Sequence, residues 1–274
     1  MPDASDARPP NRYQRIIAYI FQQRYRSGLR EVPFDREELT TAAQALGIEP
    51  PKNLGDLLYT FRYRGEMPDS VRATAPEGEE WTIRPAGRGR YAFILARIAI
   101  IAPNVLLADT KIPDATPGLV ASYALSDEQA LLAKLRYNRL VDIFMGITCY
   151  SLQNHLRTTV ASIGQVETDE LYVGVDRSGT QHIIPVQAKG HRDRIGIIQI
   201  EQDIAMCAEK FPMLVCRPIA AQFMARALIA LFEFISQNGE LRILAEKHYR
   251  LVPPESISAD DLREYQAFSK PSDA

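Results

Sequence analysis

The chain has 274 residues, 46% of them hydrophobic, and a formal net charge of −2 at pH 7. This length and apolar content suffice for one large or two ordinary domains. The near-neutral charge excludes a chain that is basic throughout, although contact with phosphate depends on local basic faces and not on the total. The most apolar run, residues 92–107, contains Arg97 and Pro103, so we expect no membrane span.

The cysteine content and the first ten residues indicate in which cell compartment the protein is expected. Cys149, Cys207 and Cys216 are an odd number without the spacing of a metal site, which predicts reduced, buried thiols. The opening sequence MPDASDARPP has no apolar core and is therefore not a signal peptide. We expect a cytoplasmic protein.

Residues 11–105 predict a small domain of helices followed by a hairpin. Apolar residues at helical spacing predict a helix over 11–26. Asp35 and Glu38 form a capping-box pattern for a second helix that ends at Gly47. A third helix begins after Asn53 and runs over 54–64, and two strands, 80–84 and 90–94, flank a turn near 87–89. This order resembles a winged-helix domain.

The winged-helix resemblance implies binding to double-stranded DNA. In that fold the third helix enters the major groove and the two-stranded wing contacts the backbone. The start and the exposed end of the third helix, together with the wing, then supply the contacts to bases and phosphates. The candidate DNA-binding residues are Lys52, Asn53, Arg62, Arg64, Arg84, Arg88 and Arg90. The alternative is a small α+β domain whose arginines form a solvated face.

The second domain, residues 106–274, begins with a proline-rich connection and then a long helix. Ser126 is a good N-cap, and the apolar face of this helix continues to about Met145. Glu128 is the first candidate for a catalytic acid on this helix and Asp142 is the second. The segment that follows is rich in hydrogen-bond donors suited to DNA: Gln153, Asn154, His155 and Arg157.

Residues 164–190 predict two strands joined by a turn. The first strand carries acids, among them Glu167 and Asp169, and the second is an apolar run that closes on Gln187 and Lys189. Residues two apart in a strand share a face, so Gln187 and Lys189 project together toward the first strand. Carboxylates, an amide oxygen and an ammonium group can hold Mg²⁺ and a phosphate.

Asp169 followed by Gln187-Ala188-Lys189 resembles the motif of the PD-(D/E)xK nuclease superfamily, in the Q-x-K variant of Mrr-like restriction endonucleases. The resemblance implies catalytic roles for Asp169, Gln187 and Lys189, with Glu128 or Glu167 as a further acid. It implies Mg²⁺ as cofactor, held by Asp169, the Gln187 side chain and the Ala188 carbonyl. Gln187 departs from the usual acid and removes one charged ligand.

The remaining sequence predicts a helix over 195–210 and buried strands at 213–219 and 228–234. The predicted fold is therefore α/β (α+β): a winged-helix-like domain plus a nuclease core with a central mixed sheet flanked by helices. The resemblance implies a type II site-specific deoxyribonuclease that cuts double-stranded DNA. Cutting both strands implies a homodimer. The alternatives are a DNA-binding regulator with an inactive nuclease core and a DNA repair nuclease.

Overall fold

The computed structural model describes residues 10–269 except 62–65, 98–99, 124–127, 162, 192, 226 and 238–239. The chain divides into two compact units. One contains residues 1–101 with short pieces from 159–165 and 196–198, and the other contains the rest. We call them the N-terminal and the C-terminal unit.

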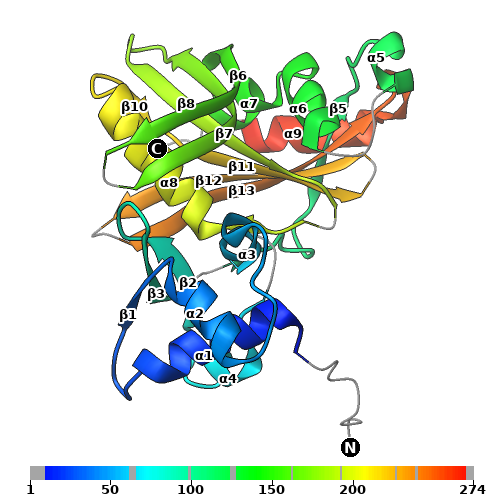
Figure 1. Ribbon diagram of the computed structural model, residues 1–274. Helices are drawn as coiled ribbons and strands as arrows, with labels where there is room; N and C mark the ends of the chain where they lie inside the picture. Colours follow the sequence, from blue (N-terminus) through cyan, green and yellow to red (C-terminus); the bar gives the residue numbers. More distant parts are fainter. Residues whose placement is uncertain are drawn as a thin grey trace, which may run out of the picture. The chain divides into compact units, whose positions relative to one another are not determined.

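The N-terminal unit combines helices with a three-stranded antiparallel sheet in the order β1-β3-β2 (Figure 1). Its elements are α1 (Arg12–Arg24), β1 (Glu31–Asp35), α2 (Glu38–Ala45), α3 (Leu54–Tyr59), α4 (Asp69–Arg72), β2 (Glu80–Pro85), β3 (Arg90–Ala96) and β4 (Ile100–Ile101).

An aromatic cluster forms the centre of this unit. Phe21 of α1 stacks on Tyr25 with ring centroids 4.8 Å apart, and it meets Trp81 and Phe93 edge to face at 5.0 and 5.1 Å. The two helical neighbours Ile17 and Ile20 are also buried. The 3.6-residue period of α1 therefore turns one apolar stripe onto the sheet, as its sequence predicts.

The structure adds the strands β1 and β4 and the short helix α4 to the predicted N-terminal elements. Residues 31–35, for which no strand was predicted, form β1, so Asp35 ends a strand and does not cap α2 with its side chain. Half of the predicted capping box is present, since the Asp35 N–H donates to Glu38 Oε1 at 2.7 Å. The hairpin of β2 and β3 is confirmed. The end of the predicted third helix, with Arg62 and Arg64, lies outside the described residues.

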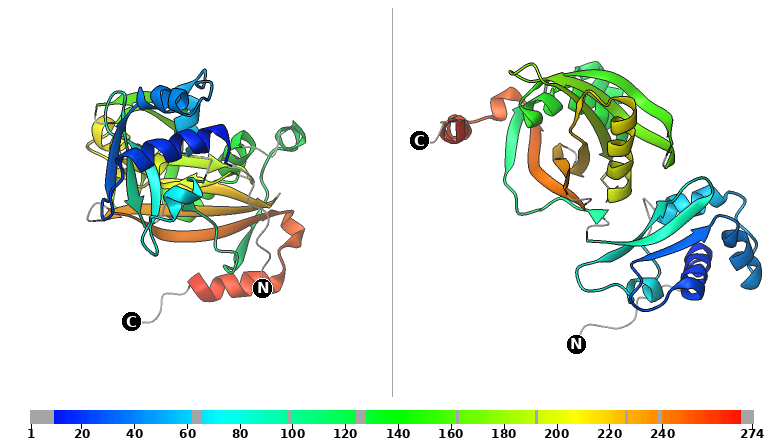
Figure 2. Two further views of the ribbon diagram at one scale, coloured as in Figure 1. Left: turned by 60° about the horizontal axis from the view of Figure 1, so that its bottom comes forward. Right: turned by 90° about the vertical axis from the view of Figure 1, so that its left-hand side faces the viewer.

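The C-terminal unit is built on a curled, mixed, eight-stranded sheet (Figure 2, right). The strand order is β5-β13-β12-β11-β8-β7-β6, and β10 pairs with β8 beside this path. The elements after residue 102 are β5 (Asp109–Pro113), α5 (Gly118–Tyr123), α6 (Glu128–Tyr137), α7 (Leu140–Met145), β6 (Thr148–Val160), β7 (Gly164–Val175), β8 (Gln181–Lys189), β9 (Ile195–Gly196), α8 (Ile197–Lys210), β10 (Val215–Cys216), β11 (Ile219–Ala225), β12 (Leu228–Gln237), β13 (Glu240–Val252) and α9 (Ala259–Ser269).

Strand β8 lies between helices on both faces of this sheet. Its residues Val186 and Ala188 belong to the apolar cluster that includes Leu131 and Leu135 of α6. The residue between them, Gln187, instead bonds to α8. Since successive strand side chains point to opposite faces, α6 and α8 cover opposite faces of β8. The predicted mixed sheet flanked by helices is confirmed at this level of detail.

Three predicted elements of the C-terminal unit differ from the structure. The single long helix is two helices, α6 and α7, because Arg139 adopts a left-handed conformation with φ of 49°. The strand predicted over 213–219 is divided between β10 and the start of β11. The strand predicted over 228–234 is present as β12 but extends to Gln237, and a further strand, β13, follows it. No helix of the described residues is long and apolar enough to cross a membrane.

Candidate active site

A well-defined hairpin positions the predicted site residues. Asp176 Oδ1 accepts hydrogen bonds from the N–H groups of Ser178 and Thr180 at 2.8 and 2.9 Å, which fixes the turn between β7 and β8. Gly179 in this turn has φ of 80°, a conformation that favours glycine. The ladder then runs from the Val175–Gln181 pair to the Glu170–Val186 pair. The predicted strand, turn and strand are confirmed.

Beyond the Glu170–Val186 pair, β7 contacts β8 through the side chain of Asp169. Its Oδ2 accepts a hydrogen bond of 2.8 Å from the backbone N–H of Ala188. The carboxylate is thus fixed against β8, beside Lys189, and its side chain is only 13% exposed. Burial raises the pKa of Asp169 above its usual value, while the Lys189 ammonium and the Ala188 N–H oppose the rise.

Lys189 joins two predicted acids from distant parts of the chain. Its Nζ lies 2.9 Å from Glu128 Oε1, at the start of α6, and 3.9 Å from Asp169 Oδ2. The Lys189 side chain is 8% exposed, whereas that of Glu128 is 39% exposed. One ammonium and two carboxylates therefore converge at the end of β8, with Glu128 on the solvent side. We call Glu128, Asp169 and Lys189 the lysine cluster.

Gln187 lies next to the lysine cluster but is held by α8. Its Nε2 donates to Asp203 Oδ2 at 2.9 Å and to the Glu167 carbonyl at 3.1 Å, and its Oε1 accepts from Gln199 at 3.3 Å. Asp203 also accepts a 2.5 Å bond from Thr168 Oγ1. The Gln187 amide oxygen is already engaged, so its role as a metal ligand stays a prediction, as does that of the Ala188 carbonyl.

Asp203 is a buried carboxyl group. It is inaccessible to solvent, and burial raises its pKa to about 7, although the bonds from Thr168 and Gln187 favour the charged form. A buried charge is tolerated only where donors compensate it. Two side-chain donors on Asp203 meet this requirement and set the orientation of the Gln187 amide.

A second buried carboxylate, Glu170, lies one residue beyond Asp169. It is inaccessible to solvent, and its Oε1 accepts from Arg136 Nη2 at 2.8 Å, from Arg136 Nε at 3.0 Å and from Ser151 Oγ at 2.6 Å. Arg136 Nη2 also donates to Asn154 Oδ1 at 2.9 Å. Glu170 thereby links α6 to β6, the edge strand next to β7.

The exposed strand β6 carries the predicted DNA-binding residues of this unit. Gln153, Asn154, His155 and Arg157 are all exposed. His155 contacts Gln129 of α6 at 2.8 Å, and Arg157 pairs with Glu167 at 3.0 Å. The Glu167 carboxylate is thus turned toward β6, so its proposed role as a catalytic acid stays a prediction.

The lysine cluster meets the minimum that Mg²⁺ requires in proteins. Over the residues that the structure describes, no group of three or more His, Cys, Asp or Glu side chains is arranged to hold a metal ion. Mg²⁺, however, is commonly held by one or two carboxylates, with water and substrate phosphate completing its shell. Asp169 and Glu128, which share Lys189, are the residues that would hold it.

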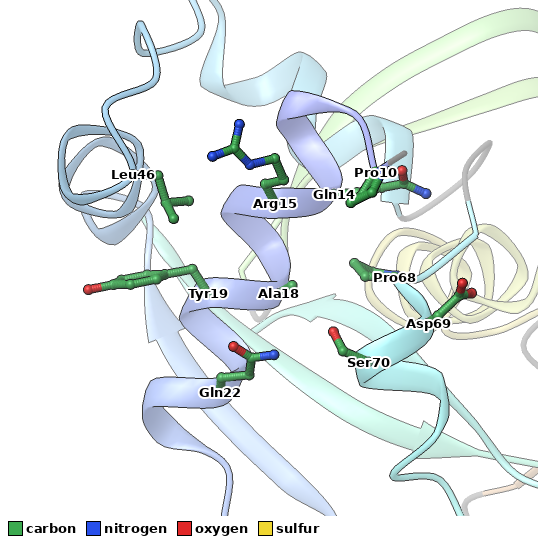
Figure 3. Close-up of a pocket in the computed structure, with 10 residues that line it drawn as sticks. All are labelled: Pro10, Gln14, Arg15, Ala18, Tyr19, Gln22, Leu46, Pro68, Asp69 and Ser70. Carbon is green, nitrogen blue, oxygen red and sulfur yellow. The ribbon is translucent and has the colours of Figure 1, made fainter. Parts of the chain in front are cut away.

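The other predicted DNA-binding residues lie in the N-terminal unit. Lys52, Asn53, Arg88 and Arg90 are exposed there, whereas Arg84 is half-buried. Asn53 caps α3, since its side chain accepts from the Gly55 N–H at 3.0 Å. A pocket between α1, Leu46 and the start of α4 contains none of the predicted site residues (Figure 3).

Three residues of the site were not predicted. Ser151 reads as one polar residue in an exposed strand, and Thr168 stands between two acids, where only the fold shows that it faces Asp203. Gln222 of β11 is opposite Lys189 in the β8–β11 register, is buried, and donates to the Asp193 carbonyl at 2.7 Å. A polar residue inside an apolar run, as in IAAQFMA, is the signal that could have found Gln222.

Comparison of the chain with protein-family models, with characterised proteins and with solved structures finds no match. The geometry of the site and its sequence motif are therefore the grounds on which a reaction can be assigned to it.

Proposed function

We propose that this chain is a Mg²⁺-dependent endonuclease of the PD-(D/E)xK type that hydrolyses phosphodiester bonds in double-stranded DNA. The observation that carries the proposal is the convergence of Asp169, Glu128 and Lys189, three residues from separate elements, at the end of β8. Titratable groups that are partly buried and share one partner are typical of active sites.

Lys189 and Asp169 of the lysine cluster have different tasks in hydrolysis. Mg²⁺ bound there would neutralise phosphate charge and make water a better nucleophile. Water attacks the phosphorus atom in line and loses a proton, and the bond to the 3′ oxygen breaks. The 3′ oxygen takes up a proton, so the products are a 5′ phosphate and a 3′ hydroxyl. The Lys189 ammonium, fixed by two carboxylates, donates to the phosphate oxygen on which negative charge accumulates. Asp169 is pinned by the Ala188 N–H, so its position does not depend on the substrate.

The topology of the N-terminal unit supports a role in DNA recognition. The strand order β1-β3-β2, with the β2–β3 hairpin after four helices, resembles the outline of a winged helix. Exposed Arg88 and Arg90 stand at the tip of the β2–β3 hairpin, where the wing of such a domain contacts phosphates. Sequence-specific cleavage of both strands would then require a homodimer, with one site for each strand.

The test is digestion of plasmid and phage DNA by the purified protein, with Mg²⁺ and with a chelator. Discrete fragments that require Mg²⁺ are expected, and the mapped ends of these fragments give the recognition sequence. The proposed endonuclease activity would be refuted if the protein binds DNA specifically but neither cleaves nor nicks it, whether the DNA is unmodified or methylated.

One observation favours a DNA-binding protein without cleavage as the second candidate. Gln187 occupies the position of a metal-binding acid, and both ends of its amide are engaged by Asp203 and Gln199. In this alternative, the hydrogen bonds of Gln187 with Asp203 and Gln199 stabilise the sheet and have no role in catalysis. Replacement of Gln187 by Glu separates the two candidates: a gain of cleavage would show that the wild-type site is silent.

A further inference from the structure

The pairing of Arg136 with Glu170 is an unusual use of a buried charge. Glu170 is inaccessible to solvent, yet Arg136 is 38% exposed. Taking a carboxylate out of water is strongly unfavourable, and one ion pair offsets this only with good geometry and further hydrogen bonds. Glu170 Oε1 accepts three such bonds, two from Arg136 and one from Ser151. The arrangement immobilises one side of the guanidinium group.

Arg136 also reaches the donor-rich strand β6 through the same nitrogen, Nη2, that bonds Glu170. Nη2 is shared between Glu170 and Asn154, and Nη1 takes part in none of these bonds. Asn154 is followed by His155, which contacts Gln129 of α6. Arg136 therefore belongs to a surface that joins α6 to the middle of β6.

We propose that Arg136 is a phosphate clamp for the nucleic-acid backbone, held in position by Glu170 and Asn154. The proposal rests on the proposed function, because it assumes that DNA passes over β6 toward the lysine cluster. A planar guanidinium group whose edge is fixed by a buried acid is preorganised to bind a phosphate. Arg136 is thus a binding and positioning residue.

The spacing along α6 fits this role. Arg136 is two helical turns after Glu128, or about 12 Å at 1.5 Å per residue. At about 3.4 Å per nucleotide along one strand, the clamped phosphate would lie a few nucleotides from the bond that is cut. Contact there fixes the register of the DNA without taking part in the chemistry.

The experiment is a titration of duplex DNA binding against salt, in chelator, with the double variant R136Q/E170Q. This variant removes both charges, so the net charge is unchanged and neither partner is left buried and alone. Affinity at low salt should fall about tenfold or more, as expected for loss of a charge-assisted contact. The negative slope of log K against log salt should become shallower by about 0.9, because one phosphate contact is lost.

A matched control is R217Q/E233Q. Arg217 and Glu233 form the same kind of pair, 2.7 Å apart, with an arginine that is 24% exposed and a carboxylate that is 8% exposed. This double variant should leave the salt slope unchanged. An unaltered affinity and slope in R136Q/E170Q, or an equal loss in the control, would overturn the clamp.

Single variants separate positioning from net charge. E170Q alone removes a negative charge, so long-range electrostatics predicts tighter DNA binding, whereas loss of the anchor predicts weaker binding. If R136Q/E170Q does not fold, the single variant R136K replaces it in the test. A lysine keeps the positive charge but cannot bond to both Glu170 and Asn154. An unchanged DNA affinity of R136K would therefore refute the role of Arg136 as a phosphate clamp. Wild-type protein that binds no DNA refutes the proposed function as well, whereas wild-type binding with an unaffected variant refutes the clamp alone.

Discussion

The interiors of the two units differ in their buried polar groups. Among the described residues of the N-terminal unit, Thr82 is the one buried polar side chain, and aromatic and aliphatic residues supply the rest. The C-terminal unit buries several ionisable groups, among them Glu170, Lys189, Asp203 and Glu233. Burial of a polar group destabilises a fold unless hydrogen bonds compensate it.

This contrast distinguishes an interior that serves stability from one that also holds the groups of a candidate active site. Apolar packing alone accounts for the N-terminal interior, so its functional residues are expected on the surface, at Arg88 and Arg90 for example. In the C-terminal unit Glu170, Lys189 and Asp203 lie on β7 and β8 or bond to them, next to Asp169 and Gln187. Glu233 is the exception, because it is on β12 and pairs with Arg217. Buried and perturbed titratable groups in one place are a mark of a functional site. Three substitutions test the contrast.

The largest effect on stability is expected in the aromatic cluster. Phe21→Ala should destabilise the N-terminal unit by about 3–5 kcal/mol, because it removes contacts with three rings and leaves a cavity. Urea unfolding followed by the fluorescence of Trp81, the single tryptophan, measures the change. Phe21→Leu, the control, should lose much less. A loss below about 1 kcal/mol for Phe21→Ala would contradict an interior that depends on apolar packing.

The second effect is a pH dependence that Asp203 imposes on the C-terminal unit. Folding raises the pKa of its carboxyl from a usual value near 3.8 to about 7. Between these values the folded state binds the proton and the unfolded state does not, so stability decreases as pH rises and levels off above pH 7. The rise corresponds to at most about 4 kcal/mol at about 1.4 kcal/mol per pKa unit.

Asp203→Asn removes this dependence. The difference in unfolding free energy, variant minus wild type, should increase between about pH 4 and pH 7, by an amount of the order of the value above. Urea unfolding followed by circular dichroism at several pH values provides the measurement, with the exposed Asp260→Asn as control. Parallel stability profiles for wild type and Asp203→Asn would show that the carboxyl is not held as the structure has it.

The smallest effect is expected at the start of α1. Asn11 accepts hydrogen bonds from the N–H groups of Tyr13 and Gln14, and Gln14 bonds back to Asn11. Asn11→Ala should destabilise the N-terminal unit by about 0.5–2 kcal/mol, and Asn11→Ser by less, because serine also caps helices. Trp81 fluorescence again reports the transition. Equal stability of Asn11→Ala and wild type would mean that this cap contributes nothing measurable.

The sequence predicted the parts of the site that depend on local pattern. Apolar residues with acids between them located β7, a short apolar run located β8, and turn composition marked the connection. Strand periodicity put Gln187 and Lys189 on one face. The motif then indicated Asp169, and a helix-start carboxylate indicated Glu128; the structure places both acids beside Lys189. Short-range rules suffice for such features.

What the sequence did not predict depends on long-range packing. Strand β13 carries charged residues on both faces, ELRILAEKHYRLV, so its alternation is weak. Pairing with β12 and β5 and the packing of Tyr249 and Leu251 in the core stabilise it. No local pattern marked Asp203 as buried, yet α8 buries it against Gln187 and Thr168. The break at Arg139 has no glycine or proline to mark it.

The most direct test of the central claim is single-turnover DNA cleavage by Lys189→Met in Mg²⁺, compared with Lys210→Met. Lys210 lies at the end of α8, is 37% exposed and pairs only with its neighbour Glu209 among the described contacts. Loss of the Lys189 ammonium should reduce the cleavage rate by about 10²–10³-fold or more, as for removal of a group that stabilises transition-state charge. DNA affinity in chelator should change little, and Lys210→Met should cleave like wild type. A Lys189→Met variant that cleaves at the wild-type rate would contradict the assignment of this site.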